Sequence, residues 1–411
     1  MNRVVITGMG VISPVGNSTE AFFSNLLAGR SGICPISRFD TTEFKVKLAA
    51  EVQGFQPEDF GIEKGLARRC DLFTQYALAA AEQAVQESGI LGTVPENRLG
   101  VYVGSGIGGM ETFVNEAYKL RDRGPGRVSP FFVPMMIGNI ASGNIAIRYG
   151  AKGPCLPVVT ACATSSHAVG EAFRAIKHGY ADAILAGGAE ATVTPLAIAG
   201  FTNLKALSES EDPECASLPF DARRKGFVLG EGAGVLVLEE YEHARARGAK
   251  MYAELVGYGN TCDAHHITAP HPEGEGGMEA VRLAVEEAGG LPDAPVYVNA
   301  HGTGTPLNDK VETLVLKRAL GEDRAREMLI SSTKSMTGHM LGAAGAVEAV
   351  VCAKALETGE LPPTIHLDCP DPECDLNYLP NQALHCQAEM ALSLSLGFGG
   401  HNAVIAMRRI A

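Results

Sequence analysis

Short β-branched runs alternate with alanine-rich amphipathic segments along this chain, and no low-complexity linker interrupts them. This alternation predicts an α/β protein in which helices pack in layers on sheets. Continuous apolar runs, such as residues 156–159, favour strands covered on both faces. The expected strands span residues 4–7, 100–104, 156–160, 183–186, 234–239, 253–259, 296–300, 329–332 and 404–407. The expected helices include residues 69–88, 165–178, 276–287, 309–320 and 342–356.

Two halves of the chain follow the same order of elements. Each has an opening strand, a glycine-flanked strand, and a strand that turns into a helix of small residues. That last unit spans residues 158–166 in the first half and 331–339 in the second. The length of 411 residues is large for one compact core. We therefore expect a diverged internal duplication, with an N-terminal half over residues 1–250 and a C-terminal half over 251–411.

Charge and composition exclude several classes of function. The net charge of −13 argues against nucleic acid as the main partner. No apolar run reaches the roughly 18 residues that a membrane span needs, so we expect no membrane insertion. The chain enters a strand-like run at Val4 without a secretory signal pattern. Ten cysteines without regular spacing indicate reduced thiols rather than a disulfide framework. Together these features predict a cytoplasmic protein.

Cys162 lies where an apolar run ends and a helix of small residues is expected to begin. A helix N-terminus lowers the pKa of a nearby thiol, and its unpaired backbone N–H groups can bind an oxyanion. Most lone cysteines are simply buried thiols, and Cys162 alone would be read in that way. Three further motifs favour the catalytic interpretation.

The second motif is Asn299-Ala300-His301-Gly302-Thr303-Gly304-Thr305-Pro306, directly after the expected strand 296–300. It presents His301 at the end of a strand, and its glycines allow a substrate to approach the backbone. Thr303 and Thr305 can hydrogen-bond a polar substrate arm. The alternative is a turn in which His301 only satisfies a carbonyl group.

The third motif is Lys334-Ser335-Met336-Thr337-Gly338-His339, which leads into a close-packed helix. Lys334 would be a fixed cation that keeps a neighbouring imidazole neutral and able to donate a hydrogen bond. Glu348 is a candidate counter-charge for Lys334. A solvated lysine, a capping histidine and an exposed glutamate are the alternatives.

The fourth motif, Gly397-Phe398-Gly399-Gly400-His401-Asn402, precedes the last expected strand. Its glycines would free Phe398 to rotate and would expose its backbone N–H as a second oxyanion donor. Read alone, the motif could be a glycine-rich hairpin. We expect His401 to have a structural role. One thiol, two histidines and one lysine in glycine-rich turns together indicate acyl transfer through a cysteine.

From end to end, the chain resembles the β-ketoacyl-(acyl-carrier-protein) synthase II family of bacterial fatty-acid synthesis, in the thiolase-like superfamily. The resemblance implies a thiolase-like, five-layered αβαβα fold built from two similar halves, and a homodimer. The matching runs, in order, are Thr160-Ala161-Cys162-Ala163-Thr164-Ser165, Gly226-Phe227-Val228-Leu229-Gly230-Glu231-Gly232-Ala233-Gly234, Ala300-His301-Gly302-Thr303-Gly304-Thr305, Ser332-Thr333-Lys334-Ser335-Met336-Thr337-Gly338-His339 and Gly397-Phe398-Gly399-Gly400.

The resemblance also implies the reaction. Cys162 would accept an acyl group from acyl carrier protein, with the backbone N–H groups of Cys162 and Phe398 holding the oxyanion. His301 and His339 would assist decarboxylation of malonyl-carrier protein, and the carbanion would attack the acyl-cysteine. This chemistry requires no cofactor and no metal. A polyketide-type ketosynthase with the same chemistry is the alternative.

Further residues take their expected roles from the resemblance alone. Leu394 stands where family members usually carry Asn, which puts in doubt a monovalent-cation site near Asn299 and Glu348. Leu396 replaces a common Phe and could change chain-length preference. Ile107, Phe132, Phe201 and Phe398 match acyl-pocket positions, with Phe132 reaching across the dimer and Phe398 acting as a gate. Arg68, Arg69, Arg127 and Lys205 are candidates for docking the acidic carrier protein.

Four rival interpretations remain open on the sequence. Gly8-Met9-Gly10 and residues 104–108 resemble dinucleotide-binding turns, but no acidic ribose ligand accompanies them. A thiolase would use a second cysteine where this chain has His339. His265, His266 and Asp263 suggest a metal hydrolase only weakly, because adjacent histidines splay apart. An inactive partner subunit would lack the nucleophile, whereas Cys162 is present.

Overall fold

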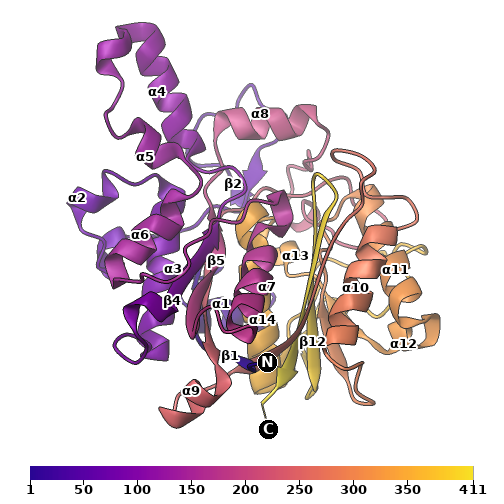
Figure 1. Cartoon of the computed structure of the whole chain (residues 1–411). Helices are drawn as coiled ribbons and strands as arrows, with labels where there is room; N and C mark the ends of the chain where they lie inside the picture. Colours follow the sequence, from indigo (N-terminus) through magenta and orange to yellow (C-terminus); the bar gives the residue numbers. More distant parts are fainter. Residues whose placement is uncertain (411) are drawn as a thin grey trace.

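The computed structural model describes residues 1–410, in which nine strands form one continuous sheet (Figure 1). A short antiparallel contact between residues 4–6 of β1 and 253–255 of β7 joins the strands of the two halves. Parallel pairs are β4·β5, β12·β8 and β8·β9, and the other neighbours are antiparallel. The order is β4 (Leu99–Gly104), β5 (Ala183–Glu190), β6 (Gly232–Glu240), β1 (Val4–Ile12), β7 (Ala253–Cys262), β13 (His401–Arg409), β12 (Met390–Gly397), β8 (Val296–Asn299) and β9 (Leu329–Ser331).

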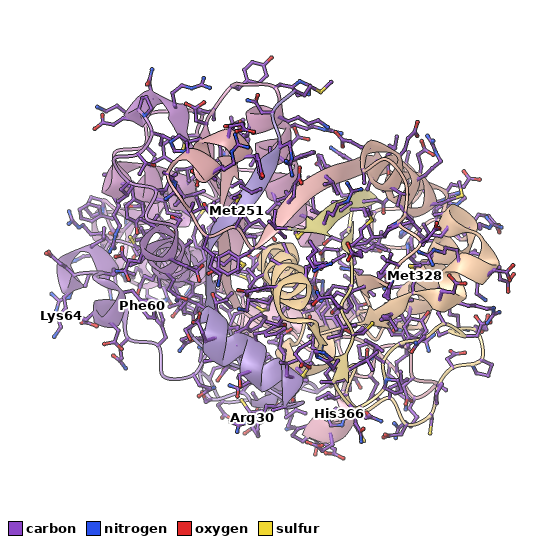
Figure 2. The ribbon with its side chains drawn as sticks, turned by 90° about the horizontal axis from the view of Figure 1, so that it is seen from below. Arg30, Phe60, Lys64, Met251, Met328 and His366 are labelled. Carbon is purple, nitrogen blue, oxygen red and sulfur yellow. The ribbon has the colours of Figure 1, made fainter. Side chains whose placement is uncertain are left out.

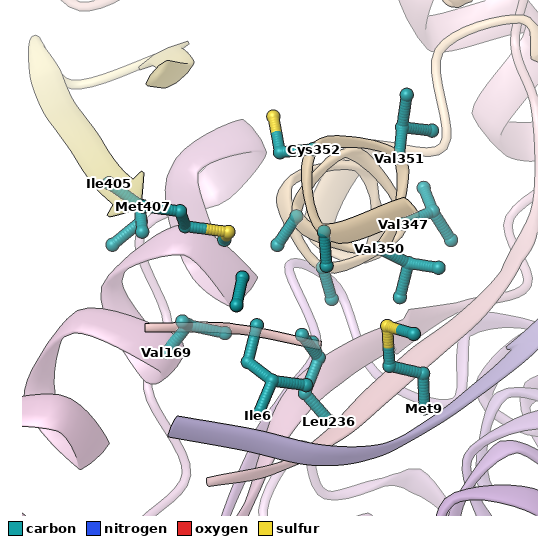
Figure 3. Close-up of a cluster of buried hydrophobic side chains, with 14 of the residues drawn as sticks. Ile6, Met9, Val169, Leu236, Val347, Val350, Val351, Cys352, Ile405 and Met407 are labelled. Atoms are coloured by element: carbon teal, nitrogen blue, oxygen red, sulfur yellow. The ribbon is translucent and has the colours of Figure 1, made fainter. Parts of the chain in front are cut away.

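Three helical layers enclose the strands of the two halves. α3 (Leu72–Ser88) and α6 (Ile140–Tyr149) cover the outer face of the first half, and α10 (Glu275–Glu287) and α11 (Pro306–Leu320) cover that of the second. α7 (Thr164–Lys177) and α14 (Ala344–Thr358) lie between them and contact strands of both halves. Their shared core brings Val169 and Val350 of these helices against Ile6 and Ile405 (Figure 3). The result is the five-layered αβαβα arrangement that the resemblance implied.

Shorter elements connect these layers. Figure 2 places Phe60 and Lys64 on one flank of the molecule and Met328 on the other, with Met251, just before β7, between them. Within residues 1–410, no helix combines the length and the apolar character needed to cross a bilayer. The remaining helices and strands are α1 (Thr19–Leu27), β2 (Cys34–Pro35), β3 (Leu48–Ala49), α2 (Lys64–Ala67), α4 (Met110–Arg123), α5 (Phe132–Met136), α8 (Pro195–Asn203), α9 (Tyr241–Ala246), α12 (Glu322–Glu327), α13 (Lys334–Thr337), β10 (Glu360–Leu361) and β11 (Leu384–His385), with 3₁₀ turns that include η4 (Ala161–Ala163) and η6 (Leu341–Ala343).

Glycines allow the first strand of each half to touch its covering helix. A Cβ atom on Gly10 of β1 would lie 1.9 Å from the carbonyl oxygen of Ala80 in α3. A Cβ atom on Gly259 of β7 would lie 1.8 Å from that of Ala280 in α10. The Gly8-Met9-Gly10 run therefore lies inside a strand against a helix. It forms no phosphate-binding turn, which removes this part of the dinucleotide-binding interpretation.

One expected strand is wrong and another was missed. Residues 156–160 form no strand, because Pro157 has no N–H to donate, and only one bridge joins Cys155 to Val101 of β4. Leu156 and Val159 are 52% and 56% exposed, so this run is not covered on both faces. Strand β12 was not expected, although its leucines and serines alternate. The other expected strands and helices are present with shifted ends.

Candidate active site

A cavity of about 530 Å³ opens at the junction of the two halves. It collects most of the residues that the four motifs single out, which come from turns far apart in the sequence. Aliphatic and aromatic side chains form much of the rest of its wall. The lining includes Gly106, Ile107, Cys162, Phe201, Lys205, His301, Thr303, Thr305, His339, Leu341, Leu396 and Phe398.

Cys162 lies in the turn η4, directly before α7, and the residue, which is 7% exposed, lines the cavity. The turn is held by the Thr160 N–H, which donates to Thr164 Oγ1 at 2.9 Å. Burial raises the pKa of the Cys162 thiol to about 12, while the charge of Lys334 and the backbone N–H of Phe398 oppose this rise. The resting group is therefore a thiol that faces a cavity, and burial outweighs the lowering of its pKa that the sequence predicted from the helix start.

The His301 and His339 rings meet edge to face, with centroids 5.3 Å apart and planes at 85°. Burial, and next the charge of Lys334, lowers the pKa of both imidazoles well below the usual value. Both rings are consequently neutral at physiological pH. Their Nδ1 atoms are buried without a hydrogen-bond partner. Two neutral imidazoles beside a thiol can donate N–H hydrogen bonds to a substrate oxygen.

Backbone contacts fix the position of each histidine. The N–H groups of His301 and Gly302 donate to the two carboxylate oxygens of Glu312 in α11, at 2.5 and 2.7 Å. The His339 N–H donates to the Val228 carbonyl at 2.7 Å. The role of Glu312 was not predicted from the sequence. Its position on the helix that follows the His301 motif was the one available signal.

Lys334 and Glu348 form a buried ion pair between α13 and α14. Each side chain is almost completely inaccessible, so the pair lies in a medium of low polarity. The lysine charge is the second cause, after burial, of the low pKa of both histidines. The structure thus brings Lys334, Glu348 and the two histidines together, as the third motif suggested.

Phe398 lies in the turn between β12 and β13, on the cavity wall. Gly399 and Gly400 adopt φ values of 85° and 77°, which glycine tolerates best. The hydroxyl groups of Thr303 and Thr305 are 3.0 Å apart on the wall. These residues line the path to Cys162.

Not every expected residue lies at the cavity. Phe132 of α5 packs 6.2 Å from Phe113, measured between ring centroids, and does not line the cavity of this chain. Arg68, Arg69 and Arg127 are exposed on the surface of the first half. Lys205 does line the cavity and also borders a second, basic hollow beside it.

Three buried oxygen atoms lack a hydrogen-bond partner next to the ion pair: Asn299 Oδ1, Ser393 Oγ and Glu348 Oε2. Asn299 and Ser393 are register partners on β8 and β12. Leu394 packs with the outer core of the second half, so its side chain lies on the opposite face of β12. Oxygen donors suit a monovalent cation, and the Leu394 replacement removes no side chain from this group.

The metal-hydrolase interpretation finds no support among residues 1–410, where no group of three or more histidine, cysteine, aspartate or glutamate side chains could hold a metal ion. His266 Nδ1 accepts hydrogen bonds from the N–H groups of Thr268 and Ala269. The Asp263 carboxylate accepts from the His271 N–H and from Asn402. These side chains therefore stabilise a turn.

Two family models match the chain: Beta-ketoacyl synthase, N-terminal domain, over residues 1–244, and Beta-ketoacyl synthase, C-terminal domain, over 252–368. The chain is 52% identical over 410 residues to 3-oxoacyl-[acyl-carrier-protein] synthase 2 of Staphylococcus aureus, covering 99% of this chain and 98% of the relative. The protein of the same description from Synechocystis is 48% identical over 409 residues, with the same coverage.

Solved structures agree with these sequence matches. The ishigamide ketosynthase/chain length factor and a beta-ketoacyl synthase from Burkholderia phymatum each superpose with a TM-score of 0.92 at 36% identity, over 100% of both chains. A type II polyketide ketosynthase in complex with its acyl-carrier protein superposes with a TM-score of 0.92 at 35% identity, also over 100% of both chains.

Replacing Lys334 by Met should destabilise the fold by roughly 3–5 kcal/mol, because Glu348 would remain buried without its partner. The double variant Lys334→Met/Glu348→Gln should regain most of that loss. Urea unfolding of the three proteins measures the effect. Equal stability of the single and double variants would contradict a coupled pair.

Proposed function

The chain belongs to the beta-ketoacyl synthase family, and we propose that it is a 3-oxoacyl-[acyl-carrier-protein] synthase that elongates fatty acids by two carbons. It is an acyltransferase that joins malonyl-carrier protein to an acyl group held on Cys162. One observation carries this proposal: a single thiol and two neutral imidazoles face one apolar cavity.

In the first step, the Cys162 sulfur attacks the thioester carbonyl of acyl-carrier protein. The backbone N–H groups of Cys162 and Phe398 donate to the oxyanion of the tetrahedral intermediate. The carbon–sulfur bond of the substrate then breaks, and the proton of the Cys162 thiol ends on the departing pantetheine sulfur. The acyl chain remains on Cys162 in the apolar part of the cavity.

In the second step, malonyl-carrier protein enters and loses CO₂. The electron pair of the broken carbon–carbon bond forms an enolate. The enolate oxygen accepts hydrogen bonds from the N–H groups of His301 and His339. Two such donors contribute about 2–4 kcal/mol each, or several powers of ten in rate. The enolate carbon attacks the acyl thioester, the carbon–sulfur bond to Cys162 breaks, and the Cys162 thiolate takes up a proton from solvent. The product is the longer 3-oxoacyl-carrier protein.

Other lining residues bind the substrates. Thr303 and Thr305 hydrogen-bond the pantetheine arm, Ile107 and Phe201 bound the acyl chain, and Phe398 moves as the acyl group loads. Phe132 completes the pocket of a second subunit. Asn299, Ser393 and Glu348 would hold a monovalent cation, which would satisfy their unpartnered oxygens and stabilise the Lys334–Glu348 pair.

A polyketide ketosynthase is the second candidate, because solved polyketide enzymes superpose over the whole chain. Their identity of 35–36% is well below the 52% shared with the Staphylococcus aureus synthase, which favours fatty-acid synthesis. We assign the reaction to the cytoplasm, where reducing conditions suit ten free cysteines.

Cys162→Ala should abolish both acyl loading and chain extension. His301→Ala should leave loading of Cys162 largely intact and reduce CO₂ release from malonyl-carrier protein by roughly two to three powers of ten, the effect of losing one oxyanion donor. Mass spectrometry of the intact protein measures loading, and labelled malonyl substrate measures CO₂. Cys352→Ala, a buried cysteine of α14 away from the cavity, is the matched control. Chain extension by Cys162→Ala would overturn the proposal.

Acyl carrier protein is the partner, and it docks on the exposed basic side chains of Arg68, Arg69, Arg127 and Lys205. Lys205→Glu should raise KM for acyl-carrier protein about tenfold, because a surface charge guides the encounter of the two proteins. KM for a small acyl-pantetheine thioester should not change. Lys152→Glu, at an exposed lysine paired with Glu96, is the control. Equal KM increases with both substrates would contradict docking.

The enzyme acts as a homodimer, and exposed apolar side chains support this state. Leu156 and Val159 lie on the irregular run before Cys162, Phe131 is exposed directly before α5, and Val133 is exposed within it. Sedimentation velocity should give twice the mass of one chain. Val159→Asp should shift the equilibrium toward monomer, because an unpaired carboxylate is costly at an interface, whereas Leu384→Asp on β11 should not. A monomeric wild type would refute the dimer.

A further inference from the structure

The buried carboxylate of Glu190 has no part in the reaction described above. It ends strand β5 and has no exposed surface. Its Oε1 accepts from Ser105 Oγ at 2.9 Å and from the Ile107 N–H at 3.2 Å. Its Oε2 accepts from the N–H groups of Gly106 and Gly342, both at 2.9 Å. Four neutral donors therefore occupy both oxygens.

These donors belong to two walls of the cavity. Residues 105–107 follow β4 in the first half, and Gly342 lies in the turn η6 of the second half. Gly106, Ile107 and Leu341, which belong to these two turns, line the cavity. One side chain thus ties together two turns that are more than two hundred residues apart in the sequence.

The two turns approach each other so closely that Gly106 and Gly342 cannot be replaced by a residue with a side chain. A Cβ atom on Gly342 would lie 2.4 Å from the Gly106 nitrogen and 2.7 Å from Glu190 Oε2. A Cβ atom on Gly106 would lie 2.8 Å from the same oxygen. Both glycines are needed so that the carboxylate can reach the backbone from two sides.

Activation of the nucleophile does not explain this carboxylate. A negative charge on Glu190 raises the pKa of Cys162, which opposes formation of the thiolate. Burial also raises the pKa of Glu190 itself, to about 7, against the effect of its four donors. A group that burial disfavours and that hinders the nucleophile needs another role.

We propose that Glu190 is a positioning residue for acyl-chain selection, which holds the Ile107 wall and the Leu341 wall at a fixed separation. This inference rests on the function proposed above. The Ile107 N–H donates a hydrogen bond directly to the Glu190 carboxylate, so this hydrogen bond helps to set the position of the Ile107 side chain. An enzyme can distinguish acyl chains that differ by a few methylenes only if the wall of its pocket is rigid.

Glu190→Gln tests the proposal with almost no change in volume. The amide keeps one acceptor oxygen, but its NH₂ group would face backbone N–H donors that it cannot satisfy. We expect the ratio of kcat/KM for dodecanoyl- over hexanoyl-carrier protein to change by about tenfold, the scale set by a few methylenes in a fitted pocket. The wild type must first load Cys162 and release CO₂. Failure there refutes the proposed function, whereas an unchanged ratio in Glu190→Gln refutes this inference alone.

Glu239→Gln is the control, because Glu239 is equally buried but lies on the neighbouring strand β6 opposite Ala183, at the other end of β5 from Glu190, where it pairs with Arg247. It should lose stability without changing the chain-length ratio. If Glu190→Gln does not fold, Ser105→Ala removes one donor to Oε1 and should change the ratio in a smaller degree. Ser142→Ala, which removes a buried serine that bonds Val103 of β4, is its control. Equal effects of test and control variants would show that Glu190 serves stability only.

Discussion

The contact between α7 and α14 is the constraint on which the rest of this structure depends. Cys162 and His339 lie in the turns that lead into these two central helices, so the distance between the helix starts sets the distance between the groups. Ser165 Oγ accepts the Ala346 N–H at 2.9 Å, which links the two starts. A Cβ atom on Gly345 would lie 1.9 Å from Ser166 Oγ. Only small residues permit such an approach, which explains the small-residue character of both helices.

Buried charge organises the space around these helix starts. Glu312 holds the backbone of the His301 turn, Lys334 is balanced by Glu348, and Glu190 joins two cavity walls. Each carboxylate is either paired or surrounded by backbone donors, as burial requires. The neutral state of the two histidines follows from the same burial, with the lysine charge adding to it. The electrostatics of the site are thus a property of the packed core.

The sequence predicted the turns that line the cavity better than the elements around them. Glycine-flanked histidines after a strand, and a cysteine before a small-residue helix, are local patterns that the structure reproduces around one cavity. The strand predicted over residues 156–160 is wrong, because the prediction followed their apolar composition and did not allow for the effect of Pro157 on strand pairing. Glu190 carries no local signal, because its donors come from distant turns. Whether Phe132, Arg68, Arg69 and Arg127 serve the site depends on other molecules, and the division at residue 250 stays a prediction.

The exposed run at residues 156–160 has a consequence for how activity responds to dilution. It enters the Cys162 turn without an intervening strand, and its Leu156 and Val159 side chains are exposed. A second subunit bound there would stabilise the backbone that carries Cys162. Turnover per chain would then fall when the subunits separate, so the monomer–dimer equilibrium would set the activity at each protein concentration.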